Sequence, residues 1–206
     1  MKYTLCLLLC SMLTSPISGQ GTNFWNRCGD KFDQTRYPVD SFAVQTQAFS
    51  FGETKIILTI LQYKFESADQ VWIEQRRGRK LLKSKYLGDI SSGESGVAIP
   101  KQQPFKELWM FRDDSEFTGI YYLITNDGVW YEIPGGSIMY DKTSRTLFTD
   151  APPECGGCTI GKFSLQSHSL KTKVSKGEEP AWKEVGKSTN LQYLFREVEW
   201  VHWKKQ

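Results

Sequence analysis

Short runs of β-branched and aromatic residues, separated by turn-forming residues, recur along the chain from Ser41 onward. The segment from Phe42 to Ala48 alternates with the period of two that is typical of a strand. The run from Lys55 to Phe65 is β-branched and apolar on both faces, which favours a central strand covered on both sides. No helical period separates these runs. The pattern therefore predicts an all-β domain, built as an antiparallel sandwich or barrel.

The clearest hairpin runs from Gly119 to Ile133. Its two apolar arms flank Asn126-Asp127-Gly128, and an Asp-Gly pair supplies the positive φ values that a tight hairpin turn needs. Residues 137–141 and 145–149 are expected to pair in the same way around Lys142-Thr143-Ser144.

The chain becomes more polar after Pro152-Pro153. We therefore expect one domain with a more irregular C-terminal segment and a boundary near residues 151–153. The stretch from Lys171 to Pro180 is predicted to be a charged loop. Residues 191–203 fit either a helical face or a strand, and their aromatic and β-branched residues favour the strand.

Residues 1–19 have the pattern of a secretory signal. Lys2 precedes an apolar run from Leu5 to Leu13, and Ser18-Gly19 supplies small residues for cleavage. Cleavage would leave residues 20–206 as a secreted, extracellular domain without a transmembrane segment. Because the signal contains one of the 26 basic residues and none of the 23 acidic ones, the remaining net charge would be 25 − 23 = +2. That excess is too small to indicate nucleic-acid binding.

Three of the five cysteines lie outside the predicted signal: Cys28, Cys155 and Cys158. An odd number of cysteines in an oxidising compartment predicts one disulfide with a leftover thiol, or an intermolecular bridge that makes a covalent dimer. Cys28 could pair with either of the others, or Cys155 and Cys158 could close a small ring. The Cys155-Gly156-Gly157-Cys158 motif precedes a strand-like segment rather than a helix, so we do not expect a redox site. No metal or cofactor is expected.

Six basic residues lie within ten positions of one another. At the tip of a hairpin they could project together and bind sulfate or phosphate groups, because arginine makes bidentate contacts with such anions. The cluster predicts contact with an extracellular protein, a glycosaminoglycan or an anionic membrane surface. The alternative is a solvated turn whose charges protect a sheet edge from aggregation. The six residues are Arg76, Arg77, Arg79, Lys80, Lys83 and Lys85.

No motif identifies catalytic residues. Neither His168 nor His202 lies in a nucleophile pattern, and Ser95 misses the G-x-S-x-G elbow by one position. We expect a secreted, non-enzymatic binding protein, such as a toxin-like effector of a gland secretion. A secreted hydrolase that brings carboxylates together from different strands is an alternative.

The segment from Leu123 to Trp130 resembles the second conserved turn of the lipocalins. The resemblance implies a carrier of a small apolar ligand, with a cavity lined by residues such as Ile120, Tyr122 and Ile124. Trp200 and Trp203 are candidates for an exposed recognition patch near the end of the chain.

Overall fold

The computed structural model describes residues 42–63, 69–90, 96–114, 119–151, 156–175 and 182–201. The chain divides into two compact units, Met1–Asp40 and Ser41–Gln206, and every described residue belongs to the second. The predicted signal at residues 1–19 and the expected boundary at Pro152-Pro153 lie outside the described residues. The described part is built from strands and turns, with one short 3-10 helix, η4 (Val185–Lys187).

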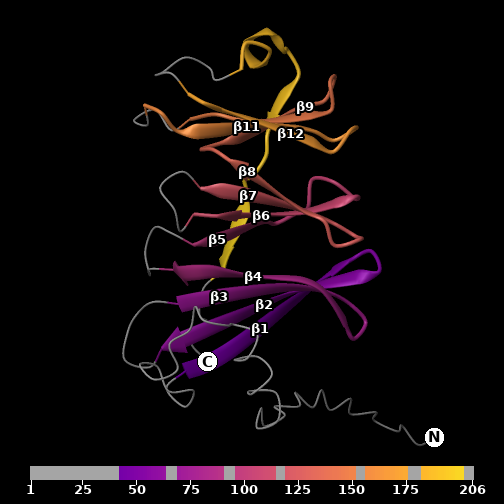
Figure 1. Cartoon of the computed structure of the whole chain (residues 1–206), viewed down its shortest axis with the longest axis vertical. Helices are drawn as coiled ribbons and strands as arrows, with labels where there is room; N and C mark the ends of the chain where they lie inside the picture. The colour runs from indigo at the N-terminus through magenta and orange to yellow at the C-terminus, as the bar shows by residue number, and fades with distance from the viewer. Residues whose placement is uncertain are drawn as a thin grey trace, which may run out of the picture. The chain divides into compact units, whose positions relative to one another are not determined.

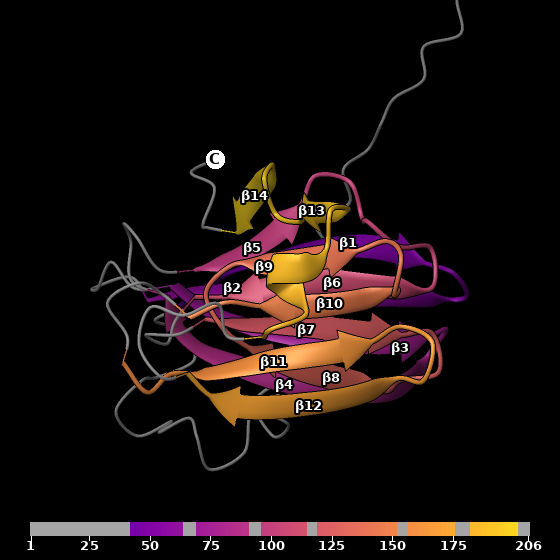
Figure 2. The ribbon, with the colours of Figure 1, turned by 90° about the horizontal axis from the view of Figure 1, so that it is seen from above.

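Fourteen described strands form three antiparallel sheets, which Figures 1 and 2 show from two directions. Sheet A has the order β1-β2-β3-β4 and contains β1 (Phe42–Phe51), β2 (Thr54–Tyr63), β3 (Asp69–Arg77) and β4 (Lys80–Ile90). Sheet B has the order β14-β5-β6-β7-β8 and contains β5 (Val97–Pro100), β6 (Leu108–Asp113), β7 (Ile120–Thr125), β8 (Trp130–Pro134) and β14 (Val198–Val201). Sheet C has the order β12-β11-β10-β9-β13 and contains β9 (Ile138–Asp141), β10 (Thr146–Thr149), β11 (Thr159–Ser164), β12 (Ser169–Val174) and β13 (Leu191–Tyr193).

Sheet B packs between the other two sheets. Alternate residues of its strands face opposite sides, so one set of side chains contacts sheet A and the other set contacts sheet C. One buried cluster joins aliphatic side chains of sheet A, such as Leu58 and Ile73, to Phe111 of sheet B. A second cluster joins the opposite face of sheet B, represented by Met110, to Leu147 of sheet C. The described sheets therefore form layers with two separate apolar interfaces. This arrangement agrees with the predicted all-β class of sandwiches and barrels.

The last described segment supplies an edge strand to two sheets. β13 pairs with β9 in sheet C, and β14 pairs with β5 in sheet B. Between these strands, Leu194 is buried in the B–C interface and Phe195 packs against Tyr121 with ring centroids 5.0 Å apart. The strand interpretation of this segment is confirmed. The segment also ties sheet B to sheet C along one side.

The predicted hairpins are confirmed. β7 and β8 flank the turn at Asn126-Asp127-Gly128, where Gly128 has a φ of +97° and its N–H donates to the carbonyl of Thr125 at 3.2 Å. β9 and β10 pair around residues 142–145. One expectation was wrong: the stretch that begins at Lys171 is not all loop, because β12 continues to Val174. Its six residues pair with β11 along one edge of sheet C.

Candidate functional site

The β3–β4 hairpin distributes the six basic residues of the predicted anion site over both faces of sheet A. Successive side chains of a strand point to opposite faces, so neighbours in the sequence separate in space. Arg76 lies on the same face as Glu74, and its Nε donates to that carboxylate at 2.8 Å. Arg77 lies on the other face, where its Nη2 donates to the backbone carbonyl of Asn126 in the β7–β8 turn at 2.9 Å.

Lys83 and Lys85 of β4 lie over the edge of sheet B formed by β8. The Lys83 Nζ is 5.4 Å from the centre of the Trp130 ring. The Lys85 Nζ donates to Glu132 at 2.8 Å and lies 4.6 Å from the centre of the Tyr122 ring. Burial alone would lower the pKa of Lys85, but its hydrogen bonds to Glu132 and Tyr122 outweigh this effect and raise the pKa above its ordinary value. These two lysines therefore contribute to the contact between sheets A and B.

Arg79 and Lys80 remain at the tip of the hairpin, next to the turn at Gly78. Both residues are exposed, and within the described ranges neither side chain has a charged or hydrogen-bonding partner. Gly78 has a φ of +55° with open space around it, so the tip extends away from the rest of the sheet. The structure thus leaves two uncompensated cations together at one exposed point. We name Arg79 and Lys80 the cationic tip.

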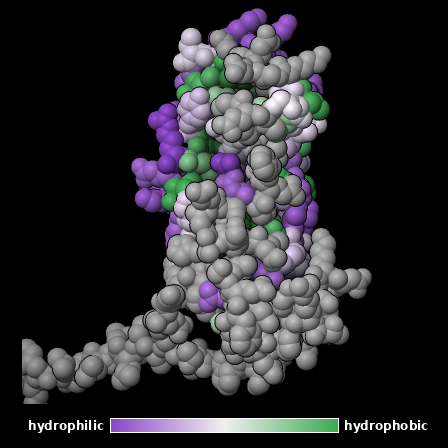
Figure 3. All heavy atoms as spheres, turned by 90° about the vertical axis from the view of Figure 1, so that its left-hand side faces the viewer, coloured by the Kyte–Doolittle hydropathy of each residue, from purple (hydrophilic) through white to green (hydrophobic). Residues whose placement is uncertain are grey.

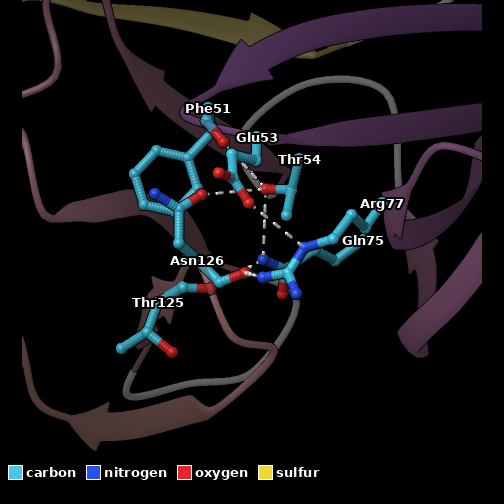
Figure 4. Close-up of polar contacts among 7 residues, drawn as sticks. All are labelled: Phe51, Glu53, Thr54, Gln75, Arg77, Thr125 and Asn126. Atoms are coloured by element: carbon cyan, nitrogen blue, oxygen red, sulfur yellow. Dashed lines mark hydrogen bonds and ion pairs between the residues drawn. The ribbon is translucent and has the colours of Figure 1, made fainter.

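A buried polar cluster anchors this hairpin to sheet B, as Figure 4 shows. The Gln75 side chain is fully buried, and its amide nitrogen donates to the Thr125 carbonyl at 2.6 Å and to the Thr54 hydroxyl at 3.3 Å. Its amide oxygen accepts from the Trp130 indole N–H at 2.8 Å. The Thr54 hydroxyl donates to the Phe51 carbonyl at 2.9 Å. Each polar group of Gln75 is therefore satisfied, as burial requires.

The β1–β2 turn closes tightly over this cluster. Gly52 has a φ of +54°, and a Cβ at this position would overlap the side-chain amide of Asn126. Only glycine fits both the backbone conformation and the space. Glu53 in the same turn lies 3.8 Å from Arg77, and both side chains are largely exposed, so this pair adds little stability.

Sequence reasoning did not identify Gln75, Thr54 and Asn126 as a cluster. One signal was present: Gln75 follows the apolar segment Val71-Trp72-Ile73 of a strand, at a position that faces the core. A polar residue at a core-facing position needs a partner. The partners of Gln75 lie on three other strands, β2, β7 and β8, and the sequence alone does not show that these strands meet around it.

The residues expected to line a carrier cavity lie in the packed A–B interface. Tyr122 and Ile124 are buried, and Ile120 packs against the same cluster. The Tyr122 ring stacks on Phe111 with centroids 4.5 Å apart and an angle of 7° between the planes. All three residues therefore belong to the apolar cluster between sheets A and B.

Large exposed hydrophobic residues come from different parts of the described chain. Trp200 on β14 is 44% exposed and Tyr193 on β13 is 45% exposed, whereas Trp203 lies outside the described residues. Val44, Val129 and Val174 are exposed on other elements. On the face that Figure 3 shows, hydrophobic side chains lie among hydrophilic ones over the described part.

Of the three candidate disulfide cysteines, the structure describes only Cys158. It is buried immediately before β11. Cys28 and Cys155 lie outside the described residues. His168 is exposed at the β11–β12 turn, where its ring lies 6.2 Å from that of Phe163; Ser95 and His202 fall in ranges without a description.

No group of three or more His, Cys, Asp or Glu side chains in the described ranges is arranged to hold a metal ion. Among the same residues, no helix has the length and apolar character needed to cross a membrane. Comparison with protein-family models, with curated proteins and with solved structures found no match for this chain.

Proposed function

We propose that the protein is a secreted, non-enzymatic binding protein that contacts an anionic extracellular partner through the cationic tip. The observation that carries this proposal is the position of Arg79 and Lys80. Both are exposed at the end of a hairpin, and neither has a partner within the described residues, whereas the other four basic side chains of the cluster are engaged in contacts. An arginine and a lysine that are not already paired can bind sulfate, phosphate or carboxylate groups.

The anchoring of the hairpin supports a binding role for its tip. Gln75 and Arg77 attach the end of β3 to the β7–β8 turn through hydrogen bonds of 2.6 Å and 2.9 Å. The cationic tip therefore extends from a fixed base. A fixed base reduces the conformational entropy lost on binding, which is a main cost of association.

The experiment is a binding titration with a sulfated heparin oligosaccharide, followed by vesicles that contain phosphatidylserine. We expect the Arg79→Ala/Lys80→Ala variant to lose about tenfold or more in affinity for one of these partners, because each removed charge contributes a charge-assisted contact. The matched control is Lys171→Ala/Lys183→Ala, which removes two exposed lysines elsewhere. Equal losses in both variants would show that only net charge matters, and the proposed site would be wrong.

The compartment and the cysteine chemistry are part of the same proposal. We propose that residues 1–19 are removed on export and that Cys158 is one half of a disulfide, with Cys28 or Cys155 as its partner. Burial of Cys158 supports this pairing, because a disulfide of a secreted domain is commonly enclosed in its fold. Amino-terminal sequencing of the exported protein should begin at Gln20, and alkylation without reductant should label one cysteine. An intact amino terminus or three labelled cysteines would contradict the proposal.

A further inference from the structure

A half-open pocket of about 390 Å³ lies at sheet C, away from the cationic tip. The β5–β6 loop forms one wall, and β9, the β9–β10 turn and β13 form the others. This volume lies within the range of small-molecule sites. Its lining includes Phe105, Lys106, Glu107, Tyr140, Lys142 and Arg145.

One wall of the pocket is aromatic. The rings of Phe105 and Tyr140 meet edge to face, with centroids 5.1 Å apart. Both residues are half-buried and pack against the cluster between sheets B and C, so their positions are fixed by the fold. This wall can therefore contact the face or edge of a planar apolar group.

The rim of the pocket is cationic. Lys106, Lys142 and Arg145 contribute three positive charges, and Glu107 contributes one negative charge, which leaves an excess of 3 − 1 = +2. Arg145 donates to Glu107 at 3.2 Å, and both side chains are about half exposed. Lys106 and Lys142 are exposed and have no ion-pair partner within the described residues. The excess charge favours an anionic ligand.

Arg145 has a backbone conformation that is unusual for a residue with a Cβ. Its φ is +50°, in the left-handed region that disfavours residues with a Cβ. Among the described residues, two others that are not glycine have a φ in this region, His168 and Phe195, and their rings pack against aromatic neighbours. The Arg145 carbonyl accepts from the Leu165 N–H at 3.0 Å, but among the described residues its side chain forms one ion pair, the exposed pair with Glu107. Such exposed pairs contribute little to stability. Glycine would be more stable at this turn position, so the guanidinium points to a role outside folding.

We infer that this pocket binds a small anionic aromatic molecule. The ligand's negative group pairs with Arg145 and Lys142, and its ring lies against Phe105 and Tyr140. The pocket shares no residue with the cationic tip, so binding at one site can be absent without affecting binding at the other.

The test uses two fluorescent probes that differ in charge. The first, 8-anilinonaphthalene-1-sulfonate, is anionic, and the second, N-phenyl-1-naphthylamine, has the same aromatic body without the sulfonate. We expect the full-length protein to bind the first probe at one site and the second more weakly. Arg145→Gly and Lys142→Ala should each weaken binding of the anionic probe about fivefold or more, and should leave binding of the neutral probe unchanged.

Lys171→Ala provides the matched control, because it removes an exposed lysine of sheet C that does not line the pocket. The thermal midpoint separates a structural role from a binding role: Arg145→Gly should keep or raise it while the affinity falls. The inference is overturned if both probes bind equally, or if the pocket variants bind the anionic probe as Lys171→Ala does. A lower thermal midpoint in Arg145→Gly would also overturn it, because Arg145 would then stabilise the turn.

Discussion

Gln75 is a fully buried amide on the core-facing side of a strand, and it is the main polar connection between sheets A and B. A buried amide costs free energy unless its donors and acceptor are paired. Its partners come from the Thr54 hydroxyl, the Thr125 carbonyl and the Trp130 indole. Gln75 therefore positions β3 against the β7–β8 hairpin, together with Arg77, which donates to the Asn126 carbonyl.

Replacement of Gln75 by alanine should destabilise the protein by about 2–4 kcal/mol, because the Trp130 N–H and the Thr125 carbonyl lose their partners in a buried site. Urea unfolding monitored by tryptophan fluorescence measures this change. Gln166→Ala, at an exposed turn, is the control and should change the free energy of unfolding by less than about 0.5 kcal/mol. A loss for Gln75→Ala as small as that of the control would rule out this role.

The candidate anion site was only partly predictable from the sequence. The sequence placed six basic residues on one hairpin, and the structure has that hairpin. The sequence could not show which of the six stay unpaired, because strand alternation sends Arg76 and Arg77 to opposite faces. Arg76 pairs there with Glu74 of its own strand, whereas Arg77 donates to Asn126 in a distant turn. Arg79 and Lys80 stay together because Arg79 lies in the turn and Lys80 directly follows it at the start of β4.

At the scale of elements, strands with clear apolar alternation or a glycine turn were predictable. The β7–β8 hairpin follows from two aromatic arms around Asp127-Gly128. β12 was missed because Lys171 and Lys173 give it a polar composition. An edge strand is paired on one side only and needs few apolar residues, and lysines on such a strand oppose edge-to-edge association. Tertiary pairing with β11 therefore decided its conformation.

Gly161 in β11 marks a close approach of sheet C to sheet B. A Cβ at this position would overlap Cγ2 of Ile133 in β8. The Gly161 N–H also donates at 2.6 Å to the buried Thr149 hydroxyl, which donates to the Pro134 carbonyl at 2.5 Å. Backbone proximity and a bridging hydroxyl together hold the two sheets at this distance.

Gly161→Ala should cost about 1–3 kcal/mol of unfolding free energy, since the added methyl group forces the sheets apart. Gly156→Ala is the control, because open space surrounds that position. The Gly161→Ala/Ile133→Ala double variant should lose less than the sum of the single losses, because the second change removes the clashing methyl group. Additive losses in chemical denaturation would show that Ile133 is not the obstacle.

At the scale of the molecule, the all-β class was predictable and the layering was not. Each sheet is made from local hairpins, but the interfaces depend on which face of each strand is turned inward. β1 turns Phe49 and Phe51 toward sheet B and exposes Val44, a choice that alternation alone leaves open. The edge strands β13 and β14 join sheets from which they are distant in sequence.

The A–B interface should make the protein sensitive to alkali. Burial raises the pKa of Tyr122 to about 12, although the hydrogen bond from Lys85 acts in the opposite direction. Above a pH of about 10 the unfolded chain releases this proton and the folded protein keeps it, so stability falls as the pH rises from about 10 to about 12. Lys85, whose pKa is also raised, changes the stability in the same direction. Its charged form stabilises the folded protein at lower pH, and this stabilisation is lost as the lysine deprotonates.

Urea unfolding midpoints from about pH 8 to about pH 11 measure this dependence. In Tyr122→Phe, the unfolding midpoint should decrease less above about pH 10, because this variant lacks the phenol group that titrates. Tyr193→Phe, at an exposed position, is the control and should keep the original profile. If Tyr122→Phe also keeps it, the interface tyrosine does not control alkaline stability.

The most direct test of the proposed binding role is an NMR titration of the isotope-labelled protein with a sulfated heparin oligosaccharide, read at the backbone amides. We expect the largest shift changes at Gly78, Arg79 and Lys80, with smaller changes along the adjoining ends of β3 and β4. The changes should disappear in Arg79→Ala/Lys80→Ala while the rest of the spectrum stays folded. Shift changes centred elsewhere, or none in the presence of both the oligosaccharide and anionic vesicles, would contradict binding through the cationic tip.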